Sequence, residues 1–338
     1  MLKVAAYTGG ENVASARFRV RQYIEPLQSL GVGITEFYPQ LTSYPPKTKL
    51  LRPFWAIGSL AQRVPSILRS KQFDICLLQR EMLSTYVTLE PFIKQPYILD
   101  VDDAIWQHRN GKFAQQLARQ ARLVICGNRF LAEYFSQWNN QVNILPTAVD
   151  TERFQPLGIK KDRGEKIIGW SGASGAFQEL YRIEKALLQV LNKHRDIKLR
   201  VIADRAPCFR TIPNSRIEFI RWTPDTEVQT IQGFSIGIMP LVDSIWNRGK
   251  CSYKMLLYMS CGIPVVVSPV GMNADILSLS KCGFGSNEID EWVEAIDGLL
   301  LNPKYAQDLG REGRACVVNH FSITKVAVEL ARMLETAK

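Results

Sequence analysis

Short apolar runs rich in branched side chains alternate with amphipathic helical patterns along the whole chain. Such runs are typical of buried strands, whereas apolar residues three and four positions apart lie on one face of a helix. The alternation predicts an α/β fold of parallel sheets with helices on both faces. The expected strands are residues 3–7, 34–38, 75–79, 97–100, 123–127, 142–146, 166–170, 198–203, 217–220, 235–240 and 264–268.

Two stretches between these strands have helical spacing. Apolar residues recur at helical intervals from Ile183 to Leu191. They do so again from Val20 to Leu30, where we expect Pro26 to bend the helix because proline removes a backbone hydrogen bond.

The pattern starts again in mid-chain. After a polar stretch at residues 158–166, a new strand runs into a glycine turn, as the first strand runs into Gly9-Gly10. A chain of 338 residues also exceeds what one core usually serves. We predict two Rossmann-like doubly wound domains facing a cleft, at residues 1–155 and 156–320, and a C-terminal helix at 321–338 that can pack back on the first domain.

Composition excludes several classes of protein. With 46% hydrophobic and 22% charged residues, the chain is not generally disordered, a coiled coil or a polytopic membrane protein. Its seven cysteines are scattered without the spacing of a zinc site, which favours a reducing compartment. The first residues read as a strand rather than a signal peptide. These features predict a cytoplasmic protein.

The net charge of +10 is concentrated in one segment, because no acidic residue occurs between Phe37 and Phe73. Mixed with leucines and the pair Phe54-Trp55, its cations predict that residues 47–71 contact the anionic inner face of a membrane. The alternative is a solvated basic face. No nucleic-acid-binding module accompanies the segment, so nucleic acid is not an expected partner. The six cations are Lys47, Lys49, Arg52, Arg63, Arg69 and Lys71.

Two glycine-containing helix starts are candidate phosphate sites. The first is Gly9-Gly10 with Arg17 beyond it, where glycine lets a ligand approach the backbone. A plain strand-to-helix turn is the alternative. At the second, we expect Gly249 to open a helix that carries Lys250 and Lys254 on one face, where a diphosphate would relieve their repulsion. A solvated basic helix is the alternative.

An acidic run follows the strand at 97–100. Asp100, Asp102 and Asp103 are suited to bind a divalent metal or sugar hydroxyls, or to act as acid and base. The alternative is that Asp102 and Asp103 only stabilise the N-terminus of a helix.

Several motifs together carry a family resemblance. They are residues 9–10, 100–104, 127–131 and 146–150 in the first half, and residues 237–241, Trp246, Gly249, Lys250, Lys254, Tyr258, Met259, 262–266 and 268–273 in the second. These motifs resemble those of family 4 glycosyltransferases, and the stretch 235–275 is the most specific. The resemblance implies a GT-B architecture, a nucleoside diphosphate sugar as co-substrate, retention of anomeric configuration, and no obligatory cofactor or metal.

The sequence departs from that family at three places. Two glutamates seven residues apart are common there, but Gly249 and Leu257 occupy the equivalent positions. A cleft histidine is replaced by Asp102 or Asp103. The basic pair after the first strand of the second domain is missing at Trp170-Ser171, which implies that later cations bind the phosphates.

The resemblance implies a retaining, hexosyl-type glycosyltransferase that transfers sugar to a glycan or lipid-linked acceptor. The alternatives are a nucleotide-sugar epimerase of the same fold and a non-catalytic nucleotide- or glycan-binding protein. The residues to which it assigns catalysis are Asp102, Asp103, Lys250 and Lys254. Those to which it assigns donor binding are Gly9, Gly10, Arg17, Trp170, Ser171, Met239, Pro240, Gly249, Cys251, Ser252, Tyr253, Asn273 and Asp275.

Overall fold

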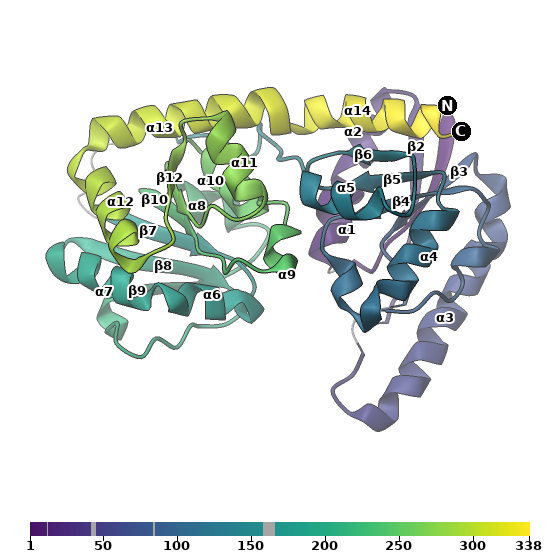
Figure 1. The fold of residues 1–338 in the computed structure, drawn as a ribbon, viewed down its shortest axis with the longest axis horizontal. Coiled ribbons are helices and arrows are strands. Elements are labelled where there is room, and N and C mark those ends of the chain that lie inside the picture. Colours follow the sequence, from purple (N-terminus) through teal and green to yellow (C-terminus); the bar gives the residue numbers. More distant parts are fainter. Residues whose placement is uncertain (12, 42–44, 84, 158–165) are drawn as a thin grey trace. The chain divides into compact units, whose positions relative to one another are not determined.

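A computed structural model describes residues 1–11, 13–41, 45–83, 85–157 and 166–338. Most of the polar stretch expected between the domains, residues 158–165, therefore lies outside the described residues. The chain forms two compact units (Figure 1). Unit 1 comprises residues 1–148, 248–251 and 323–338, and unit 2 comprises residues 149–247 and 252–322.

Unit 1 is a parallel sheet in the order β2-β1-β3-β4-β5-β6 with helices on both faces. The order starts in the middle and moves outward in both directions, as in a doubly wound sheet. Its strands are β1 (Leu2–Tyr7), β2 (Val32–Phe37), β3 (Ile75–Gln79), β4 (Tyr97–Val101), β5 (Leu123–Cys126) and β6 (Val142–Ile144). Its helices are α1 (Ala14–Arg19), α2 (Ile24–Ser29), α3 (Arg52–Arg69), α4 (Lys112–Gln120), α5 (Arg129–Phe135) and α14 (Ile323–Thr336).

Unit 2 repeats this plan in the order β12-β11-β10-β7-β8-β9. Its strands are β7 (Lys166–Ser171), β8 (Ile197–Ala203), β9 (Ile217–Arg221), β10 (Ile236–Met239), β11 (Val265–Val267) and β12 (Gly283–Gly285). Its helices are α6 (Phe177–Arg182), α7 (Glu184–Lys193), α8 (Glu227–Gln232), α10 (Tyr253–Ser260), α11 (Met272–Leu279), α12 (Ile289–Leu301) and α13 (Pro303–Cys316), and α9 (Ile245–Arg248) ends where the chain enters unit 1. The predicted α/β class with two doubly wound parallel sheets is confirmed.

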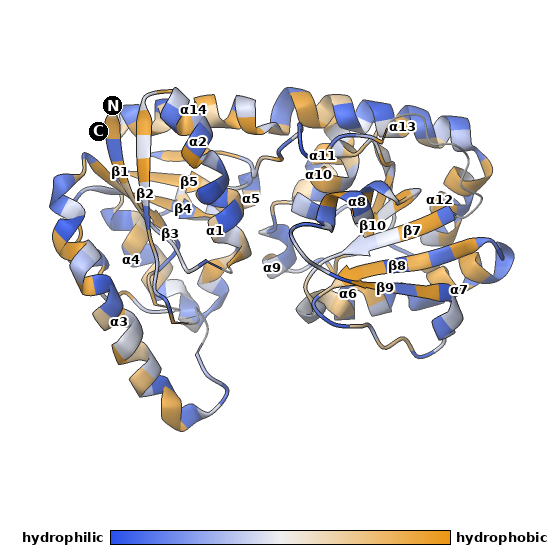
Figure 2. Cartoon of the chain, turned by 180° about the vertical axis from the view of Figure 1, so that it is seen from behind, coloured by the Kyte–Doolittle hydropathy of each residue, from blue (hydrophilic) through white to orange (hydrophobic). Residues whose placement is uncertain are grey.

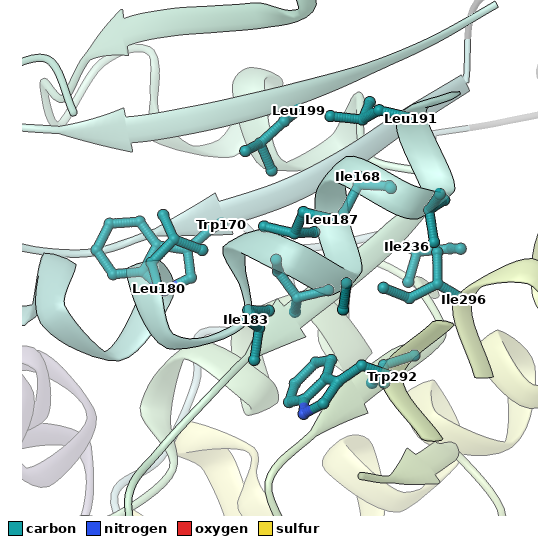
Figure 3. Close-up of a cluster of buried hydrophobic side chains, with 14 of the residues drawn as sticks. Ile168, Trp170, Leu180, Ile183, Leu187, Leu191, Leu199, Ile236, Trp292 and Ile296 are labelled. Carbon is teal, nitrogen blue, oxygen red and sulfur yellow. The ribbon is translucent and has the colours of Figure 1, made fainter. Parts of the chain in front are cut away.

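Each unit has its own hydrophobic core. In unit 2, Trp170 of β7 and Trp292 of α12 belong to one buried cluster with Ile168, Leu187 and Ile296 (Figure 3). In unit 1, Val326, Leu330 and Leu334 of α14 join a cluster that includes Val4 and Ile98 of the sheet. Their four-residue spacing gives α14 one apolar face. The C-terminal helix thus packs in unit 1, although α13 before it belongs to unit 2.

The chain leaves unit 1 after Ala148, seven residues before the expected boundary at 155. Side-chain hydrogen bonds to their carbonyls tie the following residues to unit 2. The Arg314 side chain donates to the carbonyls of Thr151 over 2.8 Å and of Phe154 over 2.6 Å. The Ser260 hydroxyl also donates to Phe154 over 2.5 Å. These long-range contacts have no signature in the local sequence.

Two local features differ from the sequence prediction. The stretch expected as one helix from Val20 to Leu30 divides into a 3-10 turn at Arg21–Tyr23 and α2, and Pro26 is the third residue of α2, where no intrahelical bond needs its missing N–H. The strand β12 was not expected, because its sequence Gly-Phe-Gly lacks a run of branched residues. Its pairing with β11 alone makes it a strand. None of the described helices is long and apolar enough to cross a membrane.

Candidate functional site

The carboxyl end of β4 in unit 1 places Asp102 and Asp103 beside Arg80, which follows the neighbouring strand β3. Arg80 Nε donates to Oδ1 of Asp102 over 2.6 Å, and Nη2 donates to Oδ2 of Asp103. Arg80 adopts a left-handed backbone conformation, with φ of 61°, and its N–H bonds to Asp100. Such a conformation is strained for a residue with a side chain, so it marks a position held by its surroundings.

Asp103 also has a second cation nearby. Lys250 Nζ lies 3.8 Å from its Oδ1, and residues 248–251 belong to unit 1. Burial and the adjacent Asp102 raise the pKa of Asp103, while Arg80 and Lys250 oppose that shift. Two cations therefore lie beside the two carboxylates, and their positive charges offset the repulsion between Asp102 and Asp103. No group of three or more metal-ligating side chains occurs within the part of the chain that the structure describes.

Asp100 has a separate, structural role. Arg19 of α1 donates to its carboxylate from Nη2 over 2.6 Å and from Nε over 3.1 Å, and both side chains are almost fully buried. Arg19 Nη1 continues to the carbonyl of Leu145 over 2.7 Å. This network joins α1 to the ends of β4 and β6, and it leaves Asp102 and Asp103 as the candidate site carboxylates of the run.

The first glycine turn follows β1. Gly10 has φ of 149°, which glycine adopts readily because it has no Cβ. Glu36 holds the base of the turn, because it accepts from the Thr8 hydroxyl over 2.6 Å and from Arg21 over 2.9 Å. Arg17, on α1, lies over the ring of Phe18 at 4.4 Å. Gly9, Gly10 and Arg17 are thus close in unit 1 through chain connectivity, and their contact with phosphate stays a prediction.

The prediction that a helix starts at Gly249 is wrong. Helix α10 begins at Tyr253, and residues 249–252 are not helical. Lys250 and Lys254 therefore do not share a helix face. Asn128, the cap of α5, holds the segment by donating to the carbonyls of Arg248 over 3.2 Å and Lys250 over 3.0 Å.

Gly249 and Cys251 pack against unit 1 backbone. A Cβ on Gly249 would lie 2.8 Å from the backbone nitrogen of Ala104, and one on Gly127 would lie 2.2 Å from Cys251 Sγ. The Cys251 thiol donates to the carbonyl of Asp102 over 3.3 Å, and burial raises its pKa to about 12. Cys251 therefore stays a neutral packing residue. This close fit explains why glycine occurs at 127 and 249.

In unit 2, a cation stands over the carboxyl end of β7. Lys254 Nζ lies 4.3 Å from the centre of the Trp170 ring. A Cβ on Gly172 would lie 2.8 Å from that Nζ, so glycine leaves the space that the lysine occupies. The backbone N–H of Ser171 donates to the Tyr258 hydroxyl over 2.8 Å, which fixes β7 to α10. Lys254 thus places a positive charge at the carboxyl end of β7, where Trp170, Ser171 and Gly172 carry no charge.

The loop after β10 is fixed by two residues that the sequence analysis missed. Glu179 of α6 accepts from the backbone N–H of Val242 and from Asn247 Nδ2, each over 2.8 Å. Asn247 also donates to the Val242 carbonyl over 2.9 Å. Met239 and Pro240, two of the predicted donor-binding residues, are buried at the end of β10 and the start of this loop. The signal for Glu179 was weak, because nothing in its own stretch distinguishes it from a solvated helix carboxylate.

The starts of α10 and α11 differ in how their buried polar side chains are hydrogen-bonded. Ser252 precedes α10 with φ of 50°, and its buried hydroxyl has no hydrogen-bond partner among the described residues. Tyr253 beside it is half-buried. At α11, Asn273 is fully buried and donates to the Ser268 carbonyl over 2.9 Å, so it holds the loop before the helix. Asp275 is exposed.

Arg80 was also missed, although a signal existed. It directly follows the predicted strand 75–79, and the next predicted strand ends in the aspartate run. Parallel neighbours end at the same edge of a sheet, so a cation after one strand and carboxylates after the next should meet.

One family matches part of the chain. Residues 165–302, most of which lie in unit 2, match the family described as Glycosyl transferases group 1. The comparisons support a GT-B glycosyltransferase. No curated protein matches the sequence.

Solved structures match nearly the whole chain at low identity. Sucrose-phosphate synthase from Thermosynechococcus elongatus is 15% identical, with a TM-score of 0.74 and 99% of each chain covered. Alr3699/HepE from Anabaena, in complex with UDP, is 12% identical, with a TM-score of 0.69, over 99% of this chain and 100% of that one. WaaG, a glycosyltransferase involved in lipopolysaccharide biosynthesis, is 11% identical, with a TM-score of 0.67 and 99% of each covered. At these identities the likeness shows the fold, which is GT-B.

Proposed function

We propose that the chain is a retaining glycosyltransferase whose unit 2 binds a nucleoside diphosphate sugar and whose unit 1 binds the acceptor. The observation that carries the proposal is the position of Lys254 over Trp170 at the end of β7, inside the matched family domain. Ligands of parallel α/β sheets bind at the carboxyl ends of the strands. The Anabaena neighbour is also described in complex with UDP and with UDP-glucose, which supports this donor class.

The donor site that we propose consists of Trp170, Ser171, Met239 and Pro240 near the nucleoside, and of Lys254 with the start of α10 near the diphosphate. A lysine and a helix N-terminus both attract phosphate. Ser252 and Tyr253 lie at that helix start. In this proposal Gly9, Gly10, Arg17 and Asp275 contribute further donor contacts, whereas Gly249, Cys251 and Asn273 act only by packing, since each is buried against backbone.

In the reaction that we propose, the bond between the anomeric carbon and the diphosphate oxygen breaks. That oxygen keeps the electron pair, and the positive charge of Lys254 stabilises the developing negative charge. The acceptor hydroxyl oxygen then bonds to the same face of the carbon, and its proton passes to the leaving phosphate. Asp102 and Asp103, held by Arg80, accept hydrogen bonds from the acceptor hydroxyls and orient them. No metal-bound step is needed.

A panel of UDP-, GDP- and ADP-sugars tests the proposal through nucleotide release, with and without glycan or lipid-linked acceptors. We expect acceptor-dependent release and an anomer of the product that matches the donor. Release that depends on no acceptor and yields an altered free sugar would establish an epimerase instead.

A non-catalytic nucleotide- or glycan-binding protein is the second candidate. It is favoured by one observation, the occurrence of Gly249 and Leu257 where the resembling family carries glutamates. Binding of UDP without turnover on any donor in the panel would establish this function and rule out the transferase.

A further inference from the structure

Helix α3 of unit 1 has its apolar face turned to solvent. Large hydrophobic residues recur at intervals of three and four residues along this face, which we call the α3 stripe, and Figure 2 shows hydrophobic positions along the helix. This spacing puts them on one side of a helix. The stripe consists of Leu50, in the 3-10 turn just before α3, and of Phe54, Ile57, Val64 and Leu68 of the helix, which are 82%, 74%, 67%, 43% and 73% exposed.

The opposite face of α3 is buried and polar. Ser59, Arg63 and Ser66 are each less than a tenth exposed. Arg63 donates from Nη2 to the carbonyl of Thr8 over 2.8 Å, and the Ser66 carbonyl accepts from the Tyr7 hydroxyl over 2.9 Å. Ser70, just beyond the helix, accepts from the backbone N–H of Lys94 over 2.9 Å. These contacts fix the rotation of the helix, so the stripe is held outward by the fold.

The exposed cations of the segment flank the stripe. Lys47, Lys49 and Arg52 are exposed at one end, and Arg69 and Lys71 are exposed at the other. Arg63 was expected among the surface cations, but it is only 2% exposed, and burial lowers its pKa to about 10. Trp55 is half-buried. Of the aromatic pair Phe54-Trp55, Phe54 is therefore the exposed residue.

We infer that the α3 stripe inserts into the interface of an anionic lipid bilayer, with Lys47, Lys49, Arg52, Arg69 and Lys71 on the headgroups. An exposed apolar stripe bordered by cations is the pattern of a helix that lies in a membrane interface. The inference has one consequence that rests on the proposed function, which is that the acceptor is a lipid-linked or membrane-proximal glycan.

The distribution of charge argues against a second copy of this chain as the partner of the α3 stripe. Two α3 stripes packed together would bring cations against cations at both ends, in either direction, because residues 37–73 contain no acidic residue. Like charges across an interface are repulsive, whereas an anionic lipid surface is complementary to both ends.

Flotation of the full chain with vesicles tests the inference. The two vesicle types are pure phosphatidylcholine and a 7:3 mixture of phosphatidylcholine and phosphatidylglycerol. At low salt we expect at least about tenfold more bound protein on the anionic vesicles, because several cations contact the headgroups. Salt should weaken this binding but not abolish it, since the apolar part is insensitive to screening.

Two variants separate the contributions. Phe54→Ser/Ile57→Ser should reduce binding at high salt about tenfold or more, while Leu279→Ser/Leu301→Ser, which changes exposed residues of unit 2, should not. Lys47→Gln/Lys49→Gln should reduce binding at low salt, with Lys185→Gln/Lys281→Gln as its control. UDP affinity should stay unchanged in all four variants, so the result is independent of whether the donor site is correct.

Three outcomes would overturn the inference. One is equal binding to neutral and anionic vesicles at low salt. Another is a loss of binding in the unit 2 controls as large as in the α3 variants. The third is a concentration-dependent dimer in light scattering that Phe54→Ser/Ile57→Ser dissociates, without vesicle binding, which would assign the stripe to a second copy of the chain.

Discussion

The guanidinium of Arg80 bridges Asp102 and Asp103, with Nε 2.6 Å from Oδ1 of Asp102 and Nη2 bonded to Asp103. A planar guanidinium can bind two carboxylates at once in fixed directions, which a lysine ammonium cannot do. The orientation of both carboxylates therefore depends on Arg80 as well as on the end of β4.

Replacement Arg80→Lys tests this dependence. The positive charge remains, but one of the carboxylates loses its partner, so we expect turnover to fall about tenfold and the free energy of unfolding to fall by about 1–3 kcal/mol. The affinity for UDP should stay within about twofold, since Arg80 makes none of the proposed donor contacts. Steady-state kinetics, urea unfolding and calorimetry with UDP give the three quantities. Equal turnover in Arg80→Lys and parent would show that the bridge does not position the carboxylates for the reaction.

The variants Asp102→Asn and Asp103→Asn test the acceptor side directly. Asparagine keeps the size of the side chain but removes its charge, so we expect at least tenfold slower turnover with UDP affinity retained. Asp150→Asn, a change of the same kind at the start of unit 2, should leave turnover near that of the parent. A chelator should also leave activity unchanged. Loss of activity with EDTA and its rescue by Mn²⁺ would show that the carboxylates hold a metal.

Replacement Lys254→Met removes the charge at the end of β7 and keeps most of the apolar stem. A charge-assisted contact to phosphate contributes about 1.5–3 kcal/mol, so the dissociation constant for UDP should rise about ten- to a hundredfold. Lys185→Met on α7 is the matched control and should bind UDP as the parent does. If calorimetry gives the same affinity for Lys254→Met and for the control, the diphosphate lies elsewhere.

The strands were largely predictable from the sequence because buried parallel strands need continuous apolar residues, and those of β1, β3, β5 and β7 supply them. The site was less predictable, because its contacts are made by residues far apart in the chain. Lys254 and Trp170 are an example, as are Arg80 and Asp103. The expected helix start at Gly249 was wrong since residues 248–251 pack in unit 1, and no local pattern encodes that tertiary contact.

The loop after β7 should be sensitive to acid through Asp204. Its carboxylate accepts from the backbone N–H of Ser174 over 2.6 Å and from the Ser174 hydroxyl over 2.7 Å, and these bonds lower the pKa of Asp204. A carboxyl whose pKa is lowered by folding stabilises the fold above its unfolded pKa of about 3.9, and that contribution is lost as the pH falls further. Between pH 5 and pH 2.5, Asp204→Asn should therefore lose less in melting temperature than the parent. A larger loss in the variant would contradict this sign.

Replacement Gly172→Ala separates the position of Lys254 from its charge. The added Cβ would lie 2.8 Å from Lys254 Nζ and 2.9 Å from the edge of the Trp170 ring. Since no positive φ is recorded at Gly172, alanine fits the backbone, and the flexible end of the lysine can move aside, but the fully buried Trp170 ring has less room to shift. We expect this overpacking to lower the free energy of unfolding by about 1–3 kcal/mol, while the dissociation constant for UDP rises severalfold.

Gly175→Ala is the control for Gly172→Ala, because a Cβ there meets no atom within 4 Å and the residue lies in the same loop. Calorimetry with UDP and urea unfolding on both variants give the comparison. The double variant Gly172→Ala/Lys254→Met should bind UDP no more weakly than Lys254→Met alone, because the alanine then has no charged group to displace. Additive losses in the double variant would mean that Gly172 contacts the nucleotide itself and that the position of Lys254 over Trp170 is irrelevant to binding.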